Sequence, residues 1–489
     1  MTYFTKKLIL SSVICTFLML SPTSYGQSSN AQDVPATKQP NILFILADDL
    51  GKEWISAYGA QDISTPNIDE LASQGIRFDN VWSHPQCTPS RVSLITGQYP
   101  YENGWVNHWD APRWGQGYLD WQQNQSVAKV MQDAGYATVA AGKWQVNDFR
   151  IEPEAMSKHG FDDYAMWTGY ETGVPESAER YWDPYIHTKK GSKTYPGEFG
   201  EDIFAEFLLN FIEQNKAQPW FAYFAMNLPH APYTTTPHKT KLNSKLDKHK
   251  AMVEYADIIL ARMIDRLEEM GERENTIIIW TTDNGTNKSL VGTLNGRKVR
   301  GGKQKTTENG INSPFIISSP GLIPTGVVSD ALIDFTDILP TFAELAESNV
   351  PSGYKLDGQS FAPYILSRQA DSSRSSILSM GGMNEAQVSE RGIENKFTFR
   401  DRVIRDKRYK LYVNATQPLS YEKLVDLQAD PQEKVNIINS KKPEVIAAKA
   451  ALIKVAQAQP KRDNDPKYRK RQALAWDKPI TVKSQVWKQ

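Results

Sequence analysis

Short apolar runs that end in polar residues are the feature that most constrains the fold of this chain. Residues 41–47 read Asn-Ile-Leu-Phe-Ile-Leu-Ala, and residues 220–226 and 276–280 are similar runs. Such runs are typical of strands buried on both faces, as in a mostly parallel sheet. Residues 250–270 instead place apolar side chains at helical spacing, which predicts a helix lying on that sheet. The sequence therefore predicts an α/β fold.

The size and charge of the chain limit the classes of protein to which it can belong. Its 489 residues are 40% hydrophobic and 23% charged, which is ordinary for a soluble globular protein. This length accommodates one large α/β domain and a smaller one. The 56 Lys and Arg residues balance the 56 Asp and Glu residues. The net charge therefore gives no indication of a polyanion-binding surface, and we expect no nucleic-acid partner.

The amino terminus has the features of a cleavable secretory signal. Lys6 and Lys7 precede an apolar run at residues 8–20, and small residues follow at 24 and 26. We expect residues 1–26 to be a signal peptide, residues 27–39 a flexible lead-in, and the mature protein to be secreted or periplasmic. Cys15 would suit a lipoprotein, but Ile14 stands where a small residue is expected. The apolar run is short for a membrane span, so we expect no stable membrane insertion.

Removal of that signal would leave Cys87 as the one cysteine of the mature chain, without a partner for an internal disulfide. A lone cysteine is either a small, buried apolar side chain or a reactive group. Thr88 as N-cap and Pro89 as first helical residue predict a helix through residues 90–95 that Gly97 ends. Cys87 would then lie at the positive end of the helix, where anions are favoured, with Arg91 on the same face. This arrangement suits a reaction on an anionic ester.

Polar residues follow several of the predicted strands. Asp48 and Asp49 come directly after residues 41–47, and Asp283 and Asn284 follow residues 276–280. Ligands of open α/β sheets bind at this edge, and adjacent carboxylates favour a divalent cation between them. Alternatively, one of the aspartates merely caps a turn.

Two basic side chains are predicted at the same edge. Lys143 follows a strand at residues 136–141 and can hold an oxygen of an anion as a point charge, although a lone lysine is more often a surface residue. His230 lies between two prolines just after residues 220–226, so its position is rigid.

The string Cys87-Thr-Pro-Ser-Arg91, followed by Leu-Ile-Thr-Gly at residues 94–97, resembles the core signature of the type I sulfatases, Cys-x-Pro-x-Arg. Further segments resemble that family in the same order along the chain. They are residues 40–51, Gly142-Lys143-Trp144, Pro229-His230-Ala231-Pro232, Asp283-Asn284-Gly285, Arg300-Gly301-Gly302-Lys303 and residues 424–433. The resemblance extends from residue 40 to about residue 436.

The resemblance implies a fold like that of alkaline phosphatase. We expect a large mixed, mostly parallel sheet sandwiched by helices at residues 40–365. A smaller subdomain with an antiparallel sheet and a helix would occupy residues 366–489, in which residues 397–413 alternate like a hairpin and residues 444–456 read as a helix.

The resemblance also implies a mechanism. A maturation enzyme would convert Cys87 to formylglycine, whose hydrated aldehyde is the nucleophile in this family. Calcium would be bound by Asp48, Asp49, Asp283 and Asn284 together with the modified Cys87. The sulfate would be surrounded by Arg91, Lys143, His230 and Lys303.

One position departs from the family pattern. Gln145 stands where the family usually has a histidine that helps to release sulfate, and glutamine can hydrogen-bond but cannot act as a base. His108 is a candidate replacement. Together with Gln145 and His108, Arg297 is a candidate substrate-binding residue.

These features predict a sulfatase acting on a sulfated carbohydrate, such as the algal polysaccharide ulvan or a glycosaminoglycan. Residues 150–200 are aromatic and loop-rich, and could either wall a substrate cleft or pack as ordinary surface. A phosphodiesterase or phosphonate-ester hydrolase on the same scaffold is one alternative. A non-catalytic protein that binds sulfated glycans is the other, because of Gln145.

Overall fold

The computed structural model describes residues 39–106, 119–167, 169–171, 173–381, 386–389, 392–395, 399–414 and 419–465. The predicted signal peptide and nearly all of the lead-in lie outside these residues, as does His108. The chain divides into two units after Lys38, and the following description concerns the unit that starts at Gln39. None of the described helices combines the length and the apolar character that crossing a membrane requires.

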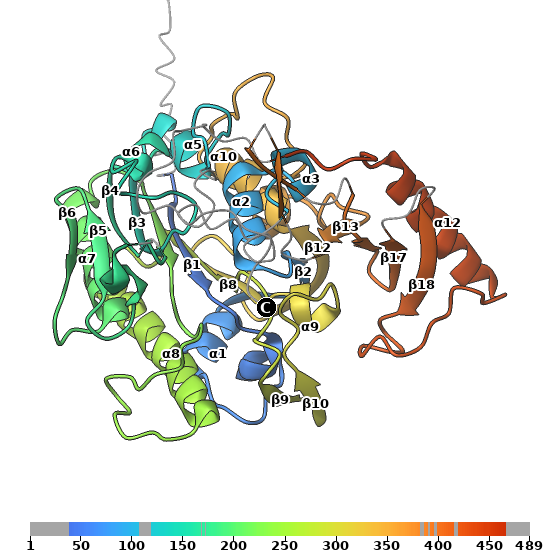
Figure 1. Ribbon diagram of the computed structural model, residues 1–489, viewed down its shortest axis with the longest axis horizontal. Coiled ribbons are helices and arrows are strands. Elements are labelled where there is room, and N and C mark those ends of the chain that lie inside the picture. Colours follow the sequence, from blue (N-terminus) through green and yellow to red (C-terminus); the bar gives the residue numbers. More distant parts are fainter. Residues whose placement is uncertain are drawn as a thin grey trace, which may run out of the picture. The chain divides into compact units, whose positions relative to one another are not determined.

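A ten-stranded mixed sheet forms the centre of the unit (Figure 1). Its strands are, in spatial order, β12 (Val327–Asp334), β2 (Gly75–Trp82), β11 (Phe315–Ser318), β8 (Thr276–Thr282), β1 (Asn41–Ala47), β7 (Trp220–Ala225), β3 (Ala137–Lys143), β4 (Asp163–Trp167), β5 (Tyr185–Thr188) and β6 (Gly191–Thr194). The strands from β8 to β4 run parallel to one another. Strand β11 is antiparallel to both of its neighbours, and β5 and β6 form an antiparallel edge.

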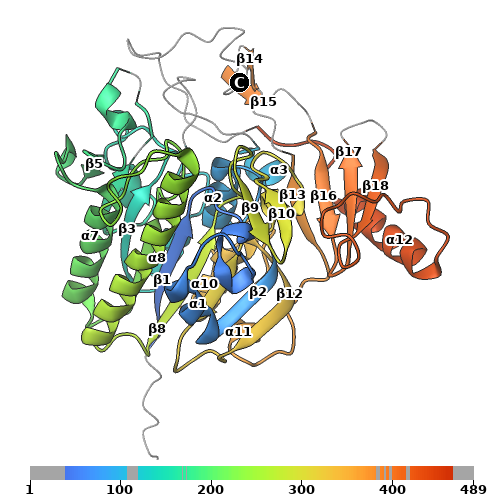
Figure 2. The same cartoon turned by 90° about the horizontal axis from the view of Figure 1, so that it is seen from below.

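Helices cover both faces of this sheet, because the side chains of its central strand are buried on both sides. Alternate residues of β1, Ile42 and Phe44, join an apolar cluster with α2 (Cys87–Thr96), α5 (Val127–Asp133) and α10 (Ile338–Leu345). The residues between them, Leu43 and Ile45, pack with α1 (Pro66–Ser73), α7 (Gly200–Asn215) and α8 (Lys245–Glu269). Figure 2 shows α7 and α8 side by side on that second face. The apolar runs and the helix expected near residues 250–270 are thus confirmed.

A smaller antiparallel sheet follows in the sequence. It consists of β13 (Ile377–Met380), β16 (Arg402–Arg405), β17 (Tyr409–Asn414) and β18 (Ser420–Asp426), in this spatial order. Helix α12 (Pro443–Ala458) packs on it through Val445 and Leu452, which share an apolar cluster with Leu411 and Leu424. The predicted fold class, a large mixed sheet between helices with a small antiparallel sheet and a helix after it, is confirmed.

Short elements complete the described fold. Two hairpins consist of β9 (Val291–Leu294) with β10 (Arg297–Arg300), and β14 (Ala386–Ser389) with β15 (Gly392–Asn395). The short helices are η1 (Lys52–Trp54), η2 (Ser56–Tyr58), α3 (Pro100–Asn103), α6 (Ala155–Lys158), η3 (Pro175–Ala178), α9 (Glu308–Ile311), η4 (Phe335–Asp337) and α11 (Ala362–Ile365).

Candidate active site

The carboxyl ends of neighbouring parallel strands bring most of the predicted polar residues to one edge of the large sheet. Asp48 and Asp49 follow β1, and Asp283 follows its neighbour β8. On the other side of β1, His230 lies in the loop after β7, and Lys143 is the last residue of the next strand, β3. Ligands of open α/β sheets bind at this edge.

Cys87 is the first residue of α2, so the helix begins two residues earlier than the sequence indicated. Gln86 is the N-cap, and the amide of Ser90 donates to the carbonyl oxygen of Gln86 at 3.3 Å. The prediction that Thr88 caps this helix is therefore wrong. Pro89 is the third helical residue, which is tolerated because amides in the first turn have no partner within the helix. Gly97 ends the helix with φ +67°, as predicted.

The Cys87 thiol is buried among groups of both charges. Its Sγ lies 3.3 Å from Asp48 Oδ1, 3.6 Å from Asp49 Oδ1 and 3.5 Å from Lys303 Nζ. Burial raises the pKa of this thiol well above its usual value, and Asp283 and Asp48 raise it further. An unmodified Cys87 is therefore a protonated thiol at neutral pH, which is a poor nucleophile.

Each carboxylate of the cluster faces a cation. Lys143 Nζ lies 2.6 Å from Asp48 Oδ2, and Lys303 Nζ lies 2.6 Å from Asp49 Oδ2. Arg91 approaches Asp283 Oδ2 with two nitrogens, Nε at 2.9 Å and a terminal guanidinium nitrogen at 2.8 Å. The cluster thus concentrates three cationic side chains that could hold an anionic group.

These pairings shift the pKa values of the carboxyl groups in different directions. Burial alone would raise the pKa of Asp48, but the charges around it, that of Lys143 foremost, hold this pKa well below its usual value. Burial and the neighbouring Asp48 raise the pKa of Asp283 to about 6. Three carboxylates packed together are the environment that a divalent cation stabilises.

The residues at the two strand ends fit a hard divalent cation. Asn284 donates its amide to Asp49 Oδ1 at 2.8 Å, while its own Oδ1 is buried and has no hydrogen-bond partner among the described residues. Ligand atoms of Asp48, Asp49, Cys87 and His230 lie within 4.8 Å of one another. We favour Asp283 and Asn284 over His230 as further ligands, since calcium and magnesium prefer oxygen to nitrogen.

His230 faces the cluster from the loop after β7. Its Nε2 lies 3.4 Å from Asp49 Oδ2 and 3.2 Å from Lys303 Nζ. Burial lowers the pKa of this imidazole to about 3, although Asp49 and Asp48 raise it, so the ring is neutral here. It is placed to contact an anion held by the lysines.

Two residues that the sequence did not single out hold the His230 loop. The hydroxyl of Tyr181 lies within hydrogen-bond distance of the carbonyl oxygens of Asn227 and His230, at 2.7 and 2.5 Å. Arg180 donates to the carbonyl oxygen of Ala231 and stacks its guanidinium over the Trp167 ring at 4.4 Å. Both lie in the aromatic, loop-rich stretch at residues 150–200, where no spacing pattern distinguishes them from surface residues.

The three candidate substrate-binding residues have different outcomes. Gln145 lies just beyond Lys143, half-buried, with a left-handed backbone (φ +69°). Arg297 starts β10 and makes no ion pair or hydrogen bond with the cluster; it lines a separate cavity. His108 lies outside the described residues, so its role stays a prediction.

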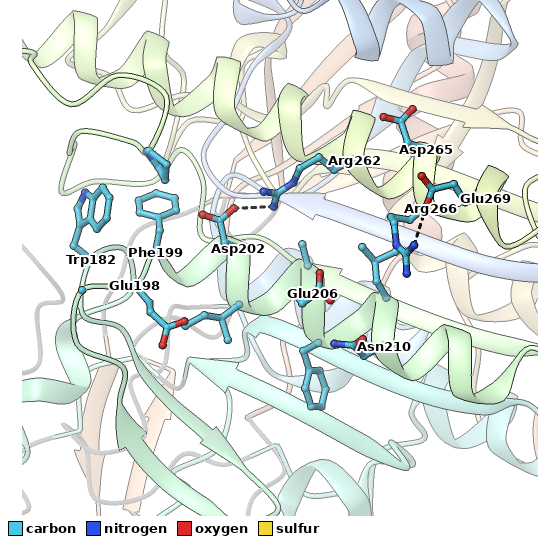
Figure 3. A pocket seen from close by; sticks show the side chains of 16 residues that line it. Trp182, Glu198, Phe199, Asp202, Glu206, Asn210, Arg262, Asp265, Arg266 and Glu269 are labelled. Atoms are coloured by element: carbon cyan, nitrogen blue, oxygen red, sulfur yellow. Dashed lines mark hydrogen bonds and ion pairs between the residues drawn. The ribbon is translucent and has the colours of Figure 1, made fainter.

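A large cavity among the described residues lies away from this cluster. It has a volume of about 970 Å³ and lies between α7 and α8, as Figure 3 shows, with Trp182 and Phe199 at one end. Four of its charged side chains form two pairs, Arg262 with Asp202 and Arg266 with Glu269, each at 2.7 Å. None of the cluster residues lines it.

Comparison with known proteins identifies relatives over most of the chain. The family model described as Sulfatase matches residues 40–348. A second model, described as N-sulphoglucosamine sulphohydrolase, C-terminal, matches residues 302–458. The N-acetylgalactosamine-6-sulfatase of Canis lupus familiaris is 30% identical over 382 residues, which cover 72% of this chain and 70% of that protein.

A further relative and a solved structure have names that mention a carbohydrate. An ulvan-active sulfatase of Formosa agariphila is 26% identical over 461 residues, covering 88% of this chain and 83% of that protein. The crystal structure of Ps i-CgsB in complex with k-i-k-neocarrahexaose matches with a TM-score of 0.71 and 24% identity, covering 88% of this chain and 95% of that chain. At this identity the structural match shows a shared fold.

Proposed function

The chain belongs to the sulfatase family of sulfuric ester hydrolases, and from that premise we propose that it releases sulfate from a sulfated carbohydrate using a formylglycine made from Cys87 and a bound calcium ion. The observation that carries this proposal is the meeting of Cys87, three aspartates and three cations at one sheet edge. The high pKa of the unmodified thiol supports the conversion, because the hydrated aldehyde supplies a hydroxyl as nucleophile instead.

The cationic side chains are suited to hold the sulfate group. Lys143, Lys303 and Arg91 would offset the charge on its oxygens, and this charge grows as the ester bond breaks. His230 would contact the leaving oxygen. A bound anion raises the pKa of a neighbouring imidazole, so substrate binding would favour the protonated form that can donate to that oxygen.

Asp48, Asp49, Asp283 and Asn284 would hold the calcium ion together with the modified Cys87. A divalent cation in this position supplies Lewis-acid activation of a hydroxyl. The unsatisfied Oδ1 of Asn284 supports this ligand set. Magnesium prefers the same oxygen donors, so the choice of calcium rests on resemblance to the family.

The substrate class rests on the relatives. Their names include N-acetylgalactosamine-6-sulfatase and ulvan-active sulfatase, so we propose a glycosaminoglycan or an algal polysaccharide. The two lysines and the short apolar run near the amino terminus support export of the enzyme. A secreted or periplasmic enzyme could reach such a polymer. A maturation enzyme in the producing cell would modify Cys87.

The test is release of inorganic sulfate by purified protein that has been co-expressed with a formylglycine-generating enzyme. Substrates are oligosaccharides of ulvan, carrageenan, chondroitin sulfate and heparin, with 4-nitrophenyl sulfate and bis(4-nitrophenyl) phosphate as small esters. We expect sulfate release from at least one sulfated ester and none by Cys87→Ala. Faster turnover of the phosphodiester would establish the alternative hydrolase. Glycan binding without any turnover would establish the non-catalytic alternative.

A further inference from the structure

We propose that a basic cavity beside the β9–β10 hairpin binds a second acidic group, sulfate or carboxylate, on the same glycan whose sulfate ester reacts at Cys87. This inference deepens the proposed function and rests on it. It assigns a polyanionic oligosaccharide as the substrate, where the cluster at Cys87 alone would accept a single sulfated sugar.

The cavity is formed by segments that are far apart in the sequence. It has a volume of about 550 Å³, with walls from the β9–β10 hairpin, the loop before α9, and the chain after β18. Arg297 and Arg300 come from the hairpin, Lys305 from the loop and Lys434 from the chain after β18. All four side chains are solvent-exposed, so they lie around the mouth of the cavity.

Four of the five carboxyl groups that line the cavity already face other cations, and the fifth belongs to Glu53. Glu308 pairs with Arg405 at 2.9 Å, and Glu433 pairs with the buried Lys410 at 2.8 Å. Asp330 likewise pairs with Lys407 at 2.9 Å, and Asp79 lies 3.5 Å from Arg77.

By contrast, the four cations at the mouth form no ion pair with any carboxylate of the described residues; they are Arg297, Arg300, Lys305 and Lys434. The balanced charge of the whole chain therefore conceals a local excess of positive charge around one cavity. Such a concave, one-signed surface attracts polyanions.

A buried acceptor lies on the wall of the cavity. The Glu53 side chain of η1 is only 2% exposed, and its Oε1 has no hydrogen-bond partner among the described residues. A buried oxygen without a partner is costly, and a sugar hydroxyl is a donor of suitable size. The cavity thus offers cations for an acidic group and an acceptor for a hydroxyl group. An acidic sugar unit carries both of these groups.

Two chain segments contribute both to this cavity and to the cluster. Lys305 lies on the same loop as Lys303, which contacts Asp49 and Cys87. Glu53 lies on η1, directly after the turn that carries Asp49. A glycan that occupies both places binds more tightly than a single ester, because the second contact is intramolecular.

The test combines Arg297→Gln with Lys434→Gln, one change on each of two walls, and both side chains are exposed. The readout is the ratio of kcat/KM for a sulfated hexasaccharide of ulvan, carrageenan or heparin to kcat/KM for 4-nitrophenyl sulfate. We expect this ratio to fall about five-fold, since two exposed charge contacts are lost. The matched control is Lys189→Gln with Lys190→Gln, two exposed lysines in the β5–β6 turn at the edge of the sheet, which should leave the ratio unchanged.

A binding measurement separates this inference from the proposed function. In the full-length Cys87→Ala protein, the double variant should weaken the hexasaccharide Kd about five-fold, whether or not the parent protein releases sulfate. A uronate-containing hexasaccharide that has been chemically desulfated distinguishes a carboxylate ligand from a sulfate ligand. The inference is overturned if neither the ratio nor the Kd differs between the double variant and the lysine control.

Discussion

At the scale of single residues, Cys87 is the group whose chemical state decides the mechanism. It is 2% exposed, and burial keeps its thiol protonated. We predict that the peptide containing Cys87, taken from protein made in its native host, is lighter than its sequence implies, because an aldehyde oxygen replaces the thiol. Peptide mass spectrometry measures this directly. Cys87 found as a plain cysteine in active protein would rule out the proposed nucleophile.

Lys143 illustrates how strongly the cluster depends on its buried charges. Its side chain is 1% exposed and its partner Asp48 is fully buried, with 2.6 Å between Nζ and Oδ2. Lys143→Met leaves that carboxylate without its closest cation, so we predict a loss of about 3–5 kcal/mol in the free energy of unfolding, measured by urea denaturation in EDTA. Excess calcium should reduce this loss, since a bound cation would replace the missing charge.

The matched control for this prediction is Lys129→Met. Lys129 makes an equally short contact with Asp133, 2.6 Å, but both side chains are about half exposed. An exposed pair of this kind contributes only about 0.3–0.5 kcal/mol. Equal losses in the two variants would contradict the prediction, because they would mean that burial of the Asp48 pair has no energetic effect.

At the scale of elements, the first turn of α7 supports the segment that leads to His230. Glu201 is fully buried there and accepts a hydrogen bond from the Asn227 amide at 2.7 Å. Burial raises the pKa of Glu201 from its usual value near 4.5 to about 8, although hydrogen bonds from Asn227 lower it. The folded protein therefore holds this carboxyl group in its protonated form at neutral pH.

The raised pKa of Glu201 predicts a specific pH dependence of stability. Between pH 4.5 and 8 the folded state binds a proton that the unfolded state lacks, so the contribution is complete below pH 4.5 and is lost as the pH rises to 8. Relative to Glu201→Gln, the wild-type free energy of unfolding should fall by as much as about 1.4 kcal/mol per pH unit in this range. Urea denaturation at several pH values measures the slope. Glu206→Gln, an exposed change on the same helix, should keep the wild-type slope.

Sequence patterns located the groups at the strand ends because the end of a strand can be recognised from a short stretch of sequence. The strands after which Asp48 and Asp283 lie are recognisable from their apolar runs, and parallel pairing then brings their ends together. The N-cap at Gln86 was missed because Pro89 fits more than one position of the first turn. Tyr181 and Arg180 were missed because only tertiary contacts bring them to the His230 loop.

The same limit applies to Arg297. Its place on a cavity wall depends on the chain after β18, which is far from Arg297 in the sequence. Neither residue periodicity nor a signature reports such long-range packing.

At the scale of the whole molecule, the large sheet and the small sheet share buried charges. Lys410 of β17 is fully buried between Glu308 of α9, at 3.1 Å, and Glu433, at 2.8 Å. The backbone amide of Glu308 also donates to Glu433 Oε2 at 2.7 Å. Separating the sheets would therefore leave charges buried without partners, which is costly.

Apolar packing joins the same two sheets. Trp82 and Leu332 of the large sheet form one cluster with Ile377 and Val403 of the small sheet. The domain boundary between residues 365 and 366 stays a prediction. The shared core argues that the two parts on either side of this boundary do not fold independently. Parts with a common core and common charges are expected to unfold cooperatively.

We therefore predict a single calorimetric unfolding transition for the mature chain, with equal calorimetric and van't Hoff enthalpies. Lys410→Met leaves two buried carboxylates without their shared cation and should lower the Tm of that whole transition, since breaking a buried pair costs about 3–5 kcal/mol. The exposed change Lys454→Met on α12 is the control and should leave the Tm nearly unchanged. Two separate transitions, or a shift by Lys410→Met of only one part of the heat absorption, would contradict the prediction. Either result would mean that the small sheet folds as a unit of its own.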